Sequence, residues 1–206
     1  MRNAPDSGID ALLFDLGGVL IEIDFQRAFA AWGTAAGIPA QSIAGRFRID
    51  EHYAAHERGE IGAPEYFASL RRSLGIGLSD EQFLAGWNAI FTGEITGMRE
   101  LLAAAAPRHA LYLFSNTCES HRAHWMPRFG DLLRPISGRY LSCEIGMRKP
   151  QTEAFALVAR RIGVAPERIA FFDDLEDNVA GARRAGLRAH RFHSPAGVAA
   201  TLGLSL

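Results

Sequence analysis

The sequence predicts a doubly wound, Rossmann-like α/β fold: a parallel sheet with helices on both faces, carrying an all-helical insertion after its first strand. Short apolar runs that end at polar residues alternate with helix-like segments along most of the chain. This strand–helix order is typical of a parallel sheet joined by crossover connections. Residues 24–95 depart from this strand–helix alternation, because they show helical segments and no strand.

Five segments are predicted to be strands of the sheet. They are residues 9–14, 110–114, 138–143, 169–172 and 188–192. Three of these segments, residues 9–14, 110–114 and 169–172, are short apolar runs without alternation, as expected of strands that are buried on both faces. Helices are expected at residues 151–162, with Pro150 in the first helical turn, and at about 175–185, followed by Gly186.

The insertion is predicted to contain four helices, at residues 25–36, 50–58, 64–74 and 80–90. Ser79 and Gln82 have the spacing of a capping box for the last of these helices. The predicted domains are therefore an α/β core of residues 1–23 and 96–206 and a helical cap of residues 24–95. An insertion at this point is expected to cover an edge of the sheet.

Composition excludes several classes of protein. The formal net charge of -1 and the pI of about 6.7 provide no basic field for nucleic acid. No apolar run approaches the roughly 18 residues of a membrane span, and residues 1–8 are expected to be a loose polar lead-in rather than a signal peptide. Cys118 and Cys143 form no C-x-x-C pair, which fits the cytoplasm and indicates neither a disulfide framework nor a zinc cluster. No obligate protein partner is evident.

Polar residues follow three of the predicted strands directly. They are Asp15, the pair Ser115 and Asn116, and the pair Asp173 and Asp174. Ligands of open parallel sheets bind outside the carboxyl ends of the strands, near the topological switch point. Helix capping explains any one of these groups about as well, but it explains all three together much less well.

Lys149 is a further candidate, because 21 of the 22 basic residues are Arg and this one is Lys. In a sequence so biased toward Arg, a position that needs only a positive charge is expected to carry Arg. Ammonium and guanidinium groups differ in size and geometry. A compact ammonium is therefore a plausible requirement here, although a surface lysine arising by chance remains the alternative.

Four ordered segments resemble the motifs of haloacid dehalogenase-like hydrolases. They are FDLGGVL at 14–20, SNT at 115–117, KP at 149–150 and FDDLEDN at 172–178. The resemblance spans essentially the whole chain, and the helical insertion matches the cap that this superfamily places between its first and second motifs. The segments 56–61, 81–83, 140–142 and 146–150 look most like the bacterial α-D-glucose-1-phosphate phosphatase branch.

The resemblance implies a phosphatase mechanism. Asp15 would attack phosphorus and form an aspartyl-phosphate that water hydrolyses. Mg²⁺ would be held by Asp15, Asp174 and the backbone carbonyl of Gly17, with Asp173 as support behind the ligands. Lys149 would bind Asp15 and the phosphoryl oxygens.

The remaining motif residues are assigned binding and supporting roles by the same resemblance. Ser115 and the backbone amide of Asn116 would donate hydrogen bonds to the phosphoryl group. Asp177 and Asn178 would orient the loop that carries the paired acids, although residues of this kind also suit the first turn of any helix.

One position departs from the family pattern. Most phosphatases of the superfamily carry a second Asp two residues after the nucleophile as general acid and base, and here that residue is Gly17. The loss costs roughly 10² to 10⁴ in rate if nothing replaces it. Either the leaving oxygen is already acidic, as in an anomeric sugar phosphate, or a nearby acid such as Glu22 or Asp24 acts through water. The branch named above also lacks this acid.

The expected function is Mg²⁺-dependent hydrolysis of a small phosphorylated metabolite, such as a hexose 1-phosphate. A 2-haloacid dehalogenase is the rival enzyme, but Asp173 and Asp174 would crowd its carboxylate substrate with negative charge. A phosphate-binding regulatory module without turnover is the non-enzymatic alternative.

Histidines and tryptophans of the sequence are expected to play structural roles. The histidine pairs 52/56 and 121/124 are expected at the surface, and the three tryptophans in the core or at the cap interface. His56, Glu57 and Arg58 either contact substrate from the cap or form a solvated helix end.

Overall fold

A computed structural model describes residues 8–205, so nearly all of the predicted polar lead-in lies outside the described residues. The centre of the fold is a five-stranded sheet in the order β5-β4-β1-β6-β7, and every neighbouring pair is parallel. The strands are β1 (Ala11–Phe14), β4 (Ala110–Ser115), β5 (Gly138–Leu141), β6 (Ile169–Asp173) and β7 (Arg188–Arg191). The predicted parallel sheet is confirmed.

The central strand β1 shows why its sequence is a continuous apolar run. Its side chains alternate between two apolar clusters: Leu12 and Phe14 belong to one, and Ala11 and Leu13 to the other. All four residues are fully buried. Because the strand order reverses beside β1, the switch point lies at its carboxyl end, directly before Asp15.

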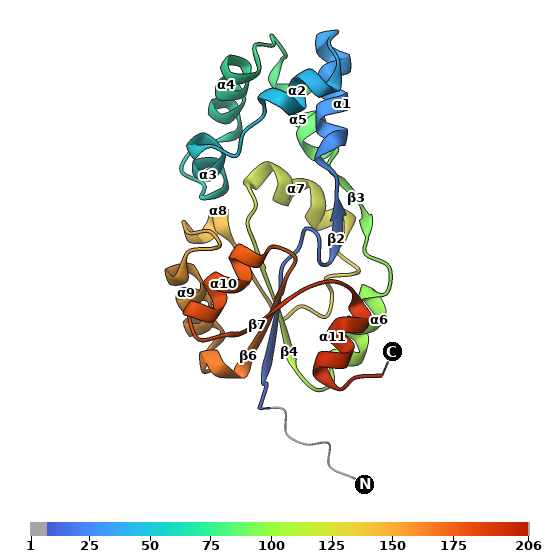
Figure 1. Cartoon of the computed structure of the whole chain (residues 1–206), viewed down its shortest axis with the longest axis vertical. Helices are drawn as coiled ribbons and strands as arrows, with labels where there is room; N and C mark the ends of the chain where they lie inside the picture. Colours follow the sequence, from blue (N-terminus) through green and yellow to red (C-terminus); the bar gives the residue numbers. More distant parts are fainter. Residues whose placement is uncertain (1–7, 206) are drawn as a thin grey trace.

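Helices cover both faces of the sheet (Figure 1). The cluster around Leu13 contains the buried faces of α9 (Thr152–Ile162) and α10 (Glu176–Arg184). The cluster around Phe14 contains those of α6 (Met98–Ala105), α7 (Glu119–Arg128) and α11 (Pro195–Leu202). A short 3₁₀ turn, η1 (Pro166–Arg168), precedes β6.

Two core details differ from the sequence prediction. The expected strand at 138–143 ends at Leu141, and α8 (Ser142–Ile145) follows it at once. The helix expected to include Pro150 begins at Thr152, and the Lys149–Pro150 peptide bond is cis. Pro150 therefore lies in the loop before the helix.

The insertion forms a separate group of helices beyond the carboxyl ends of the strands (Figure 1). They are α1 (Phe25–Ala36), α2 (Ala40–Arg46), α3 (Glu51–Glu57), α4 (Ala63–Leu74) and α5 (Asp80–Asn88). The predicted capping box of α5 is present: Ser79 Oγ accepts from the Gln82 amide at 3.2 Å, and Gln82 Oε1 accepts from the Ser79 amide at 2.9 Å.

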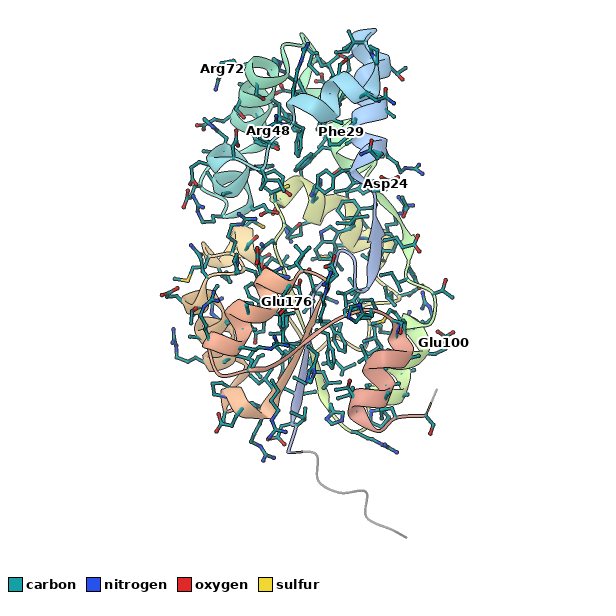
Figure 2. All side chains as sticks on the ribbon, viewed as in Figure 1. Asp24, Phe29, Arg48, Arg72, Glu100 and Glu176 are labelled. Atoms are coloured by element: carbon teal, nitrogen blue, oxygen red, sulfur yellow. The ribbon has the colours of Figure 1, made fainter. Side chains whose placement is uncertain are left out.

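The expectation that residues 24–95 contain no strand is wrong. Strand β3 (Phe91–Glu94) leads back to the core and pairs antiparallel with β2 (Ile21–Ile23). Its last three residues are Thr, Gly and Glu, so no apolar pattern marks it. The two segments that connect the core to the insertion thus lie side by side. The backbone amide of Asp24, which Figure 2 labels at the start of α1, donates to Ile90 O at 2.8 Å.

Aromatic side chains fill the centre of the insertion. Trp32 and Trp87 stack with ring centroids 6.2 Å apart, and Trp32 Nε1 donates to Phe83 O at 3.0 Å. On the core side, His121 of α7 stacks against Trp87 at 4.5 Å. All three tryptophans are buried, as predicted.

The expectation of surface histidines is wrong for two of them. His56 and His121 are 3% and 6% exposed, because both rings stack on aromatic side chains. His121 also places Nε2 3.0 Å from Trp87 O. Spacing along one helix does not reveal this burial, because the stacking partner of His121 comes from a distant segment.

Candidate active site

Most of the predicted site residues line one cavity of about 280 Å³ at the carboxyl end of the sheet. Its floor comes from the ends of β1, β4 and β6 and from the loop that carries Lys149. The predicted residues that line it are Asp15, Gly17, Ser115, Asn116, Lys149, Asp174 and Asn178. Asp173 is fully buried directly behind this surface, whereas Asp177 is exposed on the first turn of α10 and does not line the cavity.

Lys149 is the electrostatic centre of the site. Its Nζ lies 2.7 Å from Asp15 Oδ1 and 2.6 Å from Asp173 Oδ2, and its side chain is 1% exposed. Burial alone lowers the pKa of this ammonium, but the charges of Asp15 and Asp173 outweigh it and raise the pKa above its usual value. Lys149 is therefore a buried cation shared by two carboxylates.

Asp15 is held in place by a second donor besides the lysine. The backbone amide of Leu16 donates to Oδ1 at 2.6 Å. Burial raises the pKa of Asp15 to about 8; the Lys149 charge lowers it, and the Asp173 charge raises it further. The carboxylate form of Asp15 thus needs more positive charge than one ammonium supplies.

Asp173 has its acceptor oxygens fully engaged by protein donors. Oδ1 accepts from the Leu175 amide at 2.9 Å, and Asn178 Nδ2 lies 2.9 and 3.0 Å from Oδ1 and Oδ2. Together with Lys149, these donors leave Asp173 suited to positioning its neighbours rather than to binding a ligand directly. Asn178, predicted to support the paired acids, thus contacts the first of them.

Asp174 faces the cavity and has a different environment. It is partly buried, and burial followed by the charge of Asp173 raises its pKa. Oxygen atoms of Asp15, Asp173 and Asp174 lie within 4.8 Å of one another. Three carboxylates with one ammonium leave excess negative charge, and oxygen donors suit a hard divalent cation, so these residues fit such an ion.

Asn116 is tied to the lysine loop by its side chain. Its Nδ2 donates to Lys149 O at 3.0 Å, and the Lys149 amide donates to Asn116 Oδ1 at 2.8 Å. This paired contact fixes the backbone of Lys149, a positioning role that the sequence did not indicate. Neighbouring Ser115 is buried, with Oγ 3.4 Å from Asn116 O.

Gly17 occupies the position of the missing acid, and the side chain of Ile23 lies close beside it. A Cβ built on Gly17 would lie 3.0 Å from Ile23 Cδ1. The adjacent Gly18 has a φ of +77°, and its Cβ would lie 2.6 Å from Asp174 Oδ2. A side chain at position 17 would therefore displace Ile23 by a small amount, and Gly18 permits a close backbone approach to Asp174.

Glu22 and Asp24, the two acids considered as substitutes for the missing one, line a neighbouring groove that shares Asp174 with the cavity of Asp15. Both are exposed and do not line that cavity. Asp24 instead caps α1 by accepting from the Gln26 amide at 2.9 Å.

The insertion supplies the opposite wall of the cavity. Apolar side chains make much of this wall: Phe25, Ile49, Ile90 and Phe91, next to Ile23 of β2. Among them lie Tyr53 and Glu57 of α3, with Arg148 and His121 from the core. Arg148 Nη2 lies 2.7 Å from Glu57 Oε2. Glu57 therefore contacts the cavity, whereas Arg58 pairs with Glu51 and Glu60.

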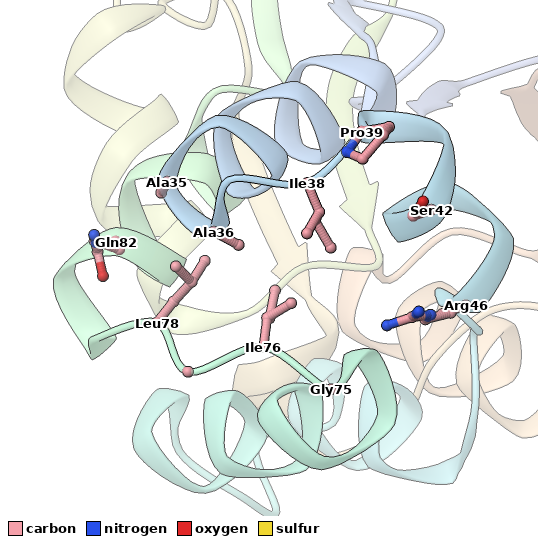
Figure 3. A pocket seen from close by; sticks show the side chains of 11 residues that line it. Ala35, Ala36, Ile38, Pro39, Ser42, Arg46, Gly75, Ile76, Leu78 and Gln82 are labelled. Carbon is pink, nitrogen blue, oxygen red and sulfur yellow. The ribbon is translucent and has the colours of Figure 1, made fainter.

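A larger hollow lies within the insertion but lacks this chemistry. It measures about 640 Å³ and is lined by residues of α1, α2 and the loop after α4 (Figure 3). Arg46 is the charged residue there, and its Nη1 donates to Leu74 O at 2.7 Å. No carboxylate or histidine is among the described residues that line this hollow.

A search of the described residues for membrane-spanning helices finds none that is long and apolar enough.

Comparisons with known proteins find phosphatases among the relatives of this chain. The chain is 25% identical over 177 residues to D-ribitol-5-phosphate phosphatase of Bacteroides thetaiotaomicron, covering 83% of this chain and 85% of that protein. It is 29% identical over 191 residues to phosphatase MT3486 of Mycobacterium tuberculosis, covering 88% and 86%. Both relatives are phosphatases that match along most of their length.

Solved structures of the same family also match this chain. The HAD family enzyme bt-2542 of Bacteroides thetaiotaomicron, in complex with magnesium and inorganic phosphate, aligns with a TM-score of 0.77 and 29% identity over 90% of this chain and 95% of that one. A dehalogenase aligns with a TM-score of 0.69 at 14% identity, which shows a shared fold alone. Residues 9–186 match the model of haloacid dehalogenase-like hydrolases. The chain belongs to this family of hydrolases.

Proposed function

We propose that this protein is a Mg²⁺-dependent phosphatase that hydrolyses small sugar or polyol phosphates through an aspartyl-phosphate at Asp15. The observation that carries the proposal is the contact of the sole lysine with Asp15, in a cavity that also contains Asp174. The named phosphatases among its relatives support the reaction class.

Lys149 prepares Asp15 for attack on phosphorus. The ammonium and the Leu16 amide both hold Oδ1, which leaves the other carboxylate oxygen for the new bond to phosphorus. Asp173, fixed by Asn178, keeps the ammonium in place. The same ammonium, Ser115 and the Asn116 amide neutralise and orient the phosphoryl oxygens.

A magnesium ion fits the remaining charge of the site. Asp15, Asp174 and the Gly17 carbonyl would hold it, with Asp173 behind them, and when bound it would offset the negative charge of carboxylate and phosphate. The relative bt-2542 was crystallised with this ion and with phosphate. Without the ion, the pKa values of Asp15 and Asp174 are raised. The positive charge of the ion would stabilise the carboxylate forms of both residues.

The leaving group is proposed to depart with little help from an acid at position 17. This favours an acidic leaving oxygen, such as that of a hexose 1-phosphate, in keeping with the resemblance to α-D-glucose-1-phosphate phosphatases. A relative acts on D-ribitol 5-phosphate, so polyol phosphates belong in the same class. We also propose that residues 24–95 act as the cap over this site and that the protein works in the cytoplasm.

Phosphate release from a panel of hexose 1-phosphates, hexose 6-phosphates, ribitol 5-phosphate and nucleotides tests the proposal. We expect turnover that requires Mg²⁺, stops with EDTA and is lost in Asp15→Asn, with no halide released from 2-haloacids. Tight binding of sugar phosphates without phosphate release would instead identify a regulatory module. Halide release without metal would identify a dehalogenase.

A further inference from the structure

A charged pair forms part of the cavity wall supplied by the insertion and by the lysine loop. Glu57 is the last residue of α3, and Arg148 directly precedes Lys149. Both line the cavity, and Arg148 Nη2 lies 2.7 Å from Glu57 Oε2. The pair thus joins two segments distant in sequence at the cavity where substrate is proposed to bind.

The environment of the pair differs from that of a surface ion pair. Its side chains are 22% and 9% exposed for Arg148 and Glu57, and the Arg148 guanidinium lies 6.0 Å from the centre of the Tyr53 ring. Arg148 Nε is buried and has no hydrogen-bond partner in the described part of the chain. A buried donor of this kind is usually satisfied by a bound molecule or by water.

Much of the surrounding wall is apolar. Ile49, Phe25 and Phe91 share it with the pair. Apolar side chains suit the C–H faces of a small ring or chain, whereas a carboxylate and a guanidinium accept from and donate to hydroxyl groups. The wall therefore offers contacts for both parts of a polyhydroxylated leaving group.

We propose that Glu57 and Arg148 determine specificity by binding the hydroxyl groups of a neutral, singly phosphorylated polyol or sugar. This inference rests on the proposed phosphatase function and names its leaving group. Glu57 accepts hydrogen bonds from hydroxyls, and Arg148 donates to a hydroxyl oxygen.

The same pair excludes a second anionic group. Because Glu57 already neutralises Arg148, a second phosphate or a carboxylate on the substrate would meet the Glu57 carboxylate beside an arginine whose charge is already offset. Like charges at close range in a partly buried site are unfavourable. A substrate without hydroxyls would in turn leave Arg148 Nε without a hydrogen-bond partner, and this lowers its relative rate.

Substrate ratios measured on Glu57→Gln test the inference. The substrates are glucose 1-phosphate, glucose 1,6-bisphosphate and phenyl phosphate, which lacks hydroxyls. We expect kcat/KM for glucose 1-phosphate relative to phenyl phosphate to fall about tenfold or more, as for one lost hydrogen bond to a charged group, mainly through KM. The ratio of bisphosphate to monophosphate should rise about tenfold, because the variant frees the Arg148 charge.

Glu60→Gln is the matched control, because Glu60 lies in the same segment, pairs with Arg58 and does not line the cavity. Its substrate ratios should stay within about twofold of the wild type, the range of a distant surface change. An equal loss on all three substrates in Glu57→Gln would show that the pair only holds the insertion against the core, and it would overturn the inference. Unchanged ratios would do the same.

Phenyl phosphate separates this inference from the proposed function. Wild-type turnover of phenyl phosphate that requires Asp15 and Mg²⁺ upholds the phosphatase even when the ratios fail to move. A wild-type protein that releases phosphate from none of the three substrates refutes both.

Discussion

Replacement of Lys149 tests the requirement for a compact ammonium most directly. Nζ sits between Asp15 Oδ1 at 2.7 Å and Asp173 Oδ2 at 2.6 Å. The rings of Phe114 and Phe171 have their centres 5.6 Å from it. Arginine would bring a larger, planar group into this enclosed space, while methionine would remove the charge and keep a similar volume.

The two variants are expected to fail for different reasons. Lys149→Met leaves two buried carboxylates without their cation, which costs about 3–5 kcal/mol of unfolding free energy at pH 8. Lys149→Arg keeps the charge but overpacks the site, which costs about 1–3 kcal/mol. Both should lower kcat by at least about 10²-fold, because the donor to Asp15 and phosphate is lost or displaced.

Urea unfolding in EDTA at pH 5 and pH 8, together with phosphate release in Mg²⁺, measures these effects. The deficit of Lys149→Met should be smaller at pH 5, where Asp15 is protonated and needs no counter-ion. Arg122→Lys, in an exposed pair with Glu119, is the control and should change stability by less than about 0.5 kcal/mol. Native stability and turnover in Lys149→Arg would refute the reasoning, because any cation would then suffice.

Three further predictions concern the glycines and the carboxylates of the site. Gly17→Asp combined with Ile23→Ala should raise kcat on an alkyl phosphate about 10²-fold, and by more than Gly17→Asp alone, because Ile23 Cδ1 must shift to admit the new side chain. Equal gains in both variants would contradict the steric explanation. Gly18→Ala should raise the Mg²⁺ concentration for half-maximal activity at least about tenfold, the effect of disturbing a ligand, because its Cβ would meet Asp174; an unchanged magnesium titration would argue against this contact. Without metal, the pKa of Asp15 is raised from 3.8 to about 8. The stability that protonated Asp15 contributes is therefore complete below pH 4 and is lost as pH rises through 8. The melting temperature in EDTA should fall from pH 5 to pH 8, and it should fall less steeply in Asp15→Asn.

The sequence allowed the sheet and most of the floor of the cavity to be predicted. Asp15, Ser115 and Asp174 each follow a short apolar run, and the carboxyl ends of parallel strands meet at one edge. The rarity of lysine singled out Lys149, and the structure places its ammonium against Asp15. These predictions depend on local pattern and on topology, which a single sequence carries.

Features that depend on contacts between distant segments could not be predicted. Nothing near Glu57 indicates that it meets Arg148, since the two lie on different domains of the predicted organisation. The close approach of Ile23 to Gly17 likewise arises from the path of β2. Helix α2 and strand β3 were missed because both are short and have no periodic apolar pattern.

Because the sequence contains a single lysine, the site can be labelled selectively with an isotope. A protein grown with ¹⁵N-lysine carries side-chain label at one ammonium among its 206 residues, and that ammonium lies at the centre of the site. Burial and two carboxylate contacts slow its exchange with water, so its resonance can be followed directly during titrations with magnesium, phosphate or sugar phosphates.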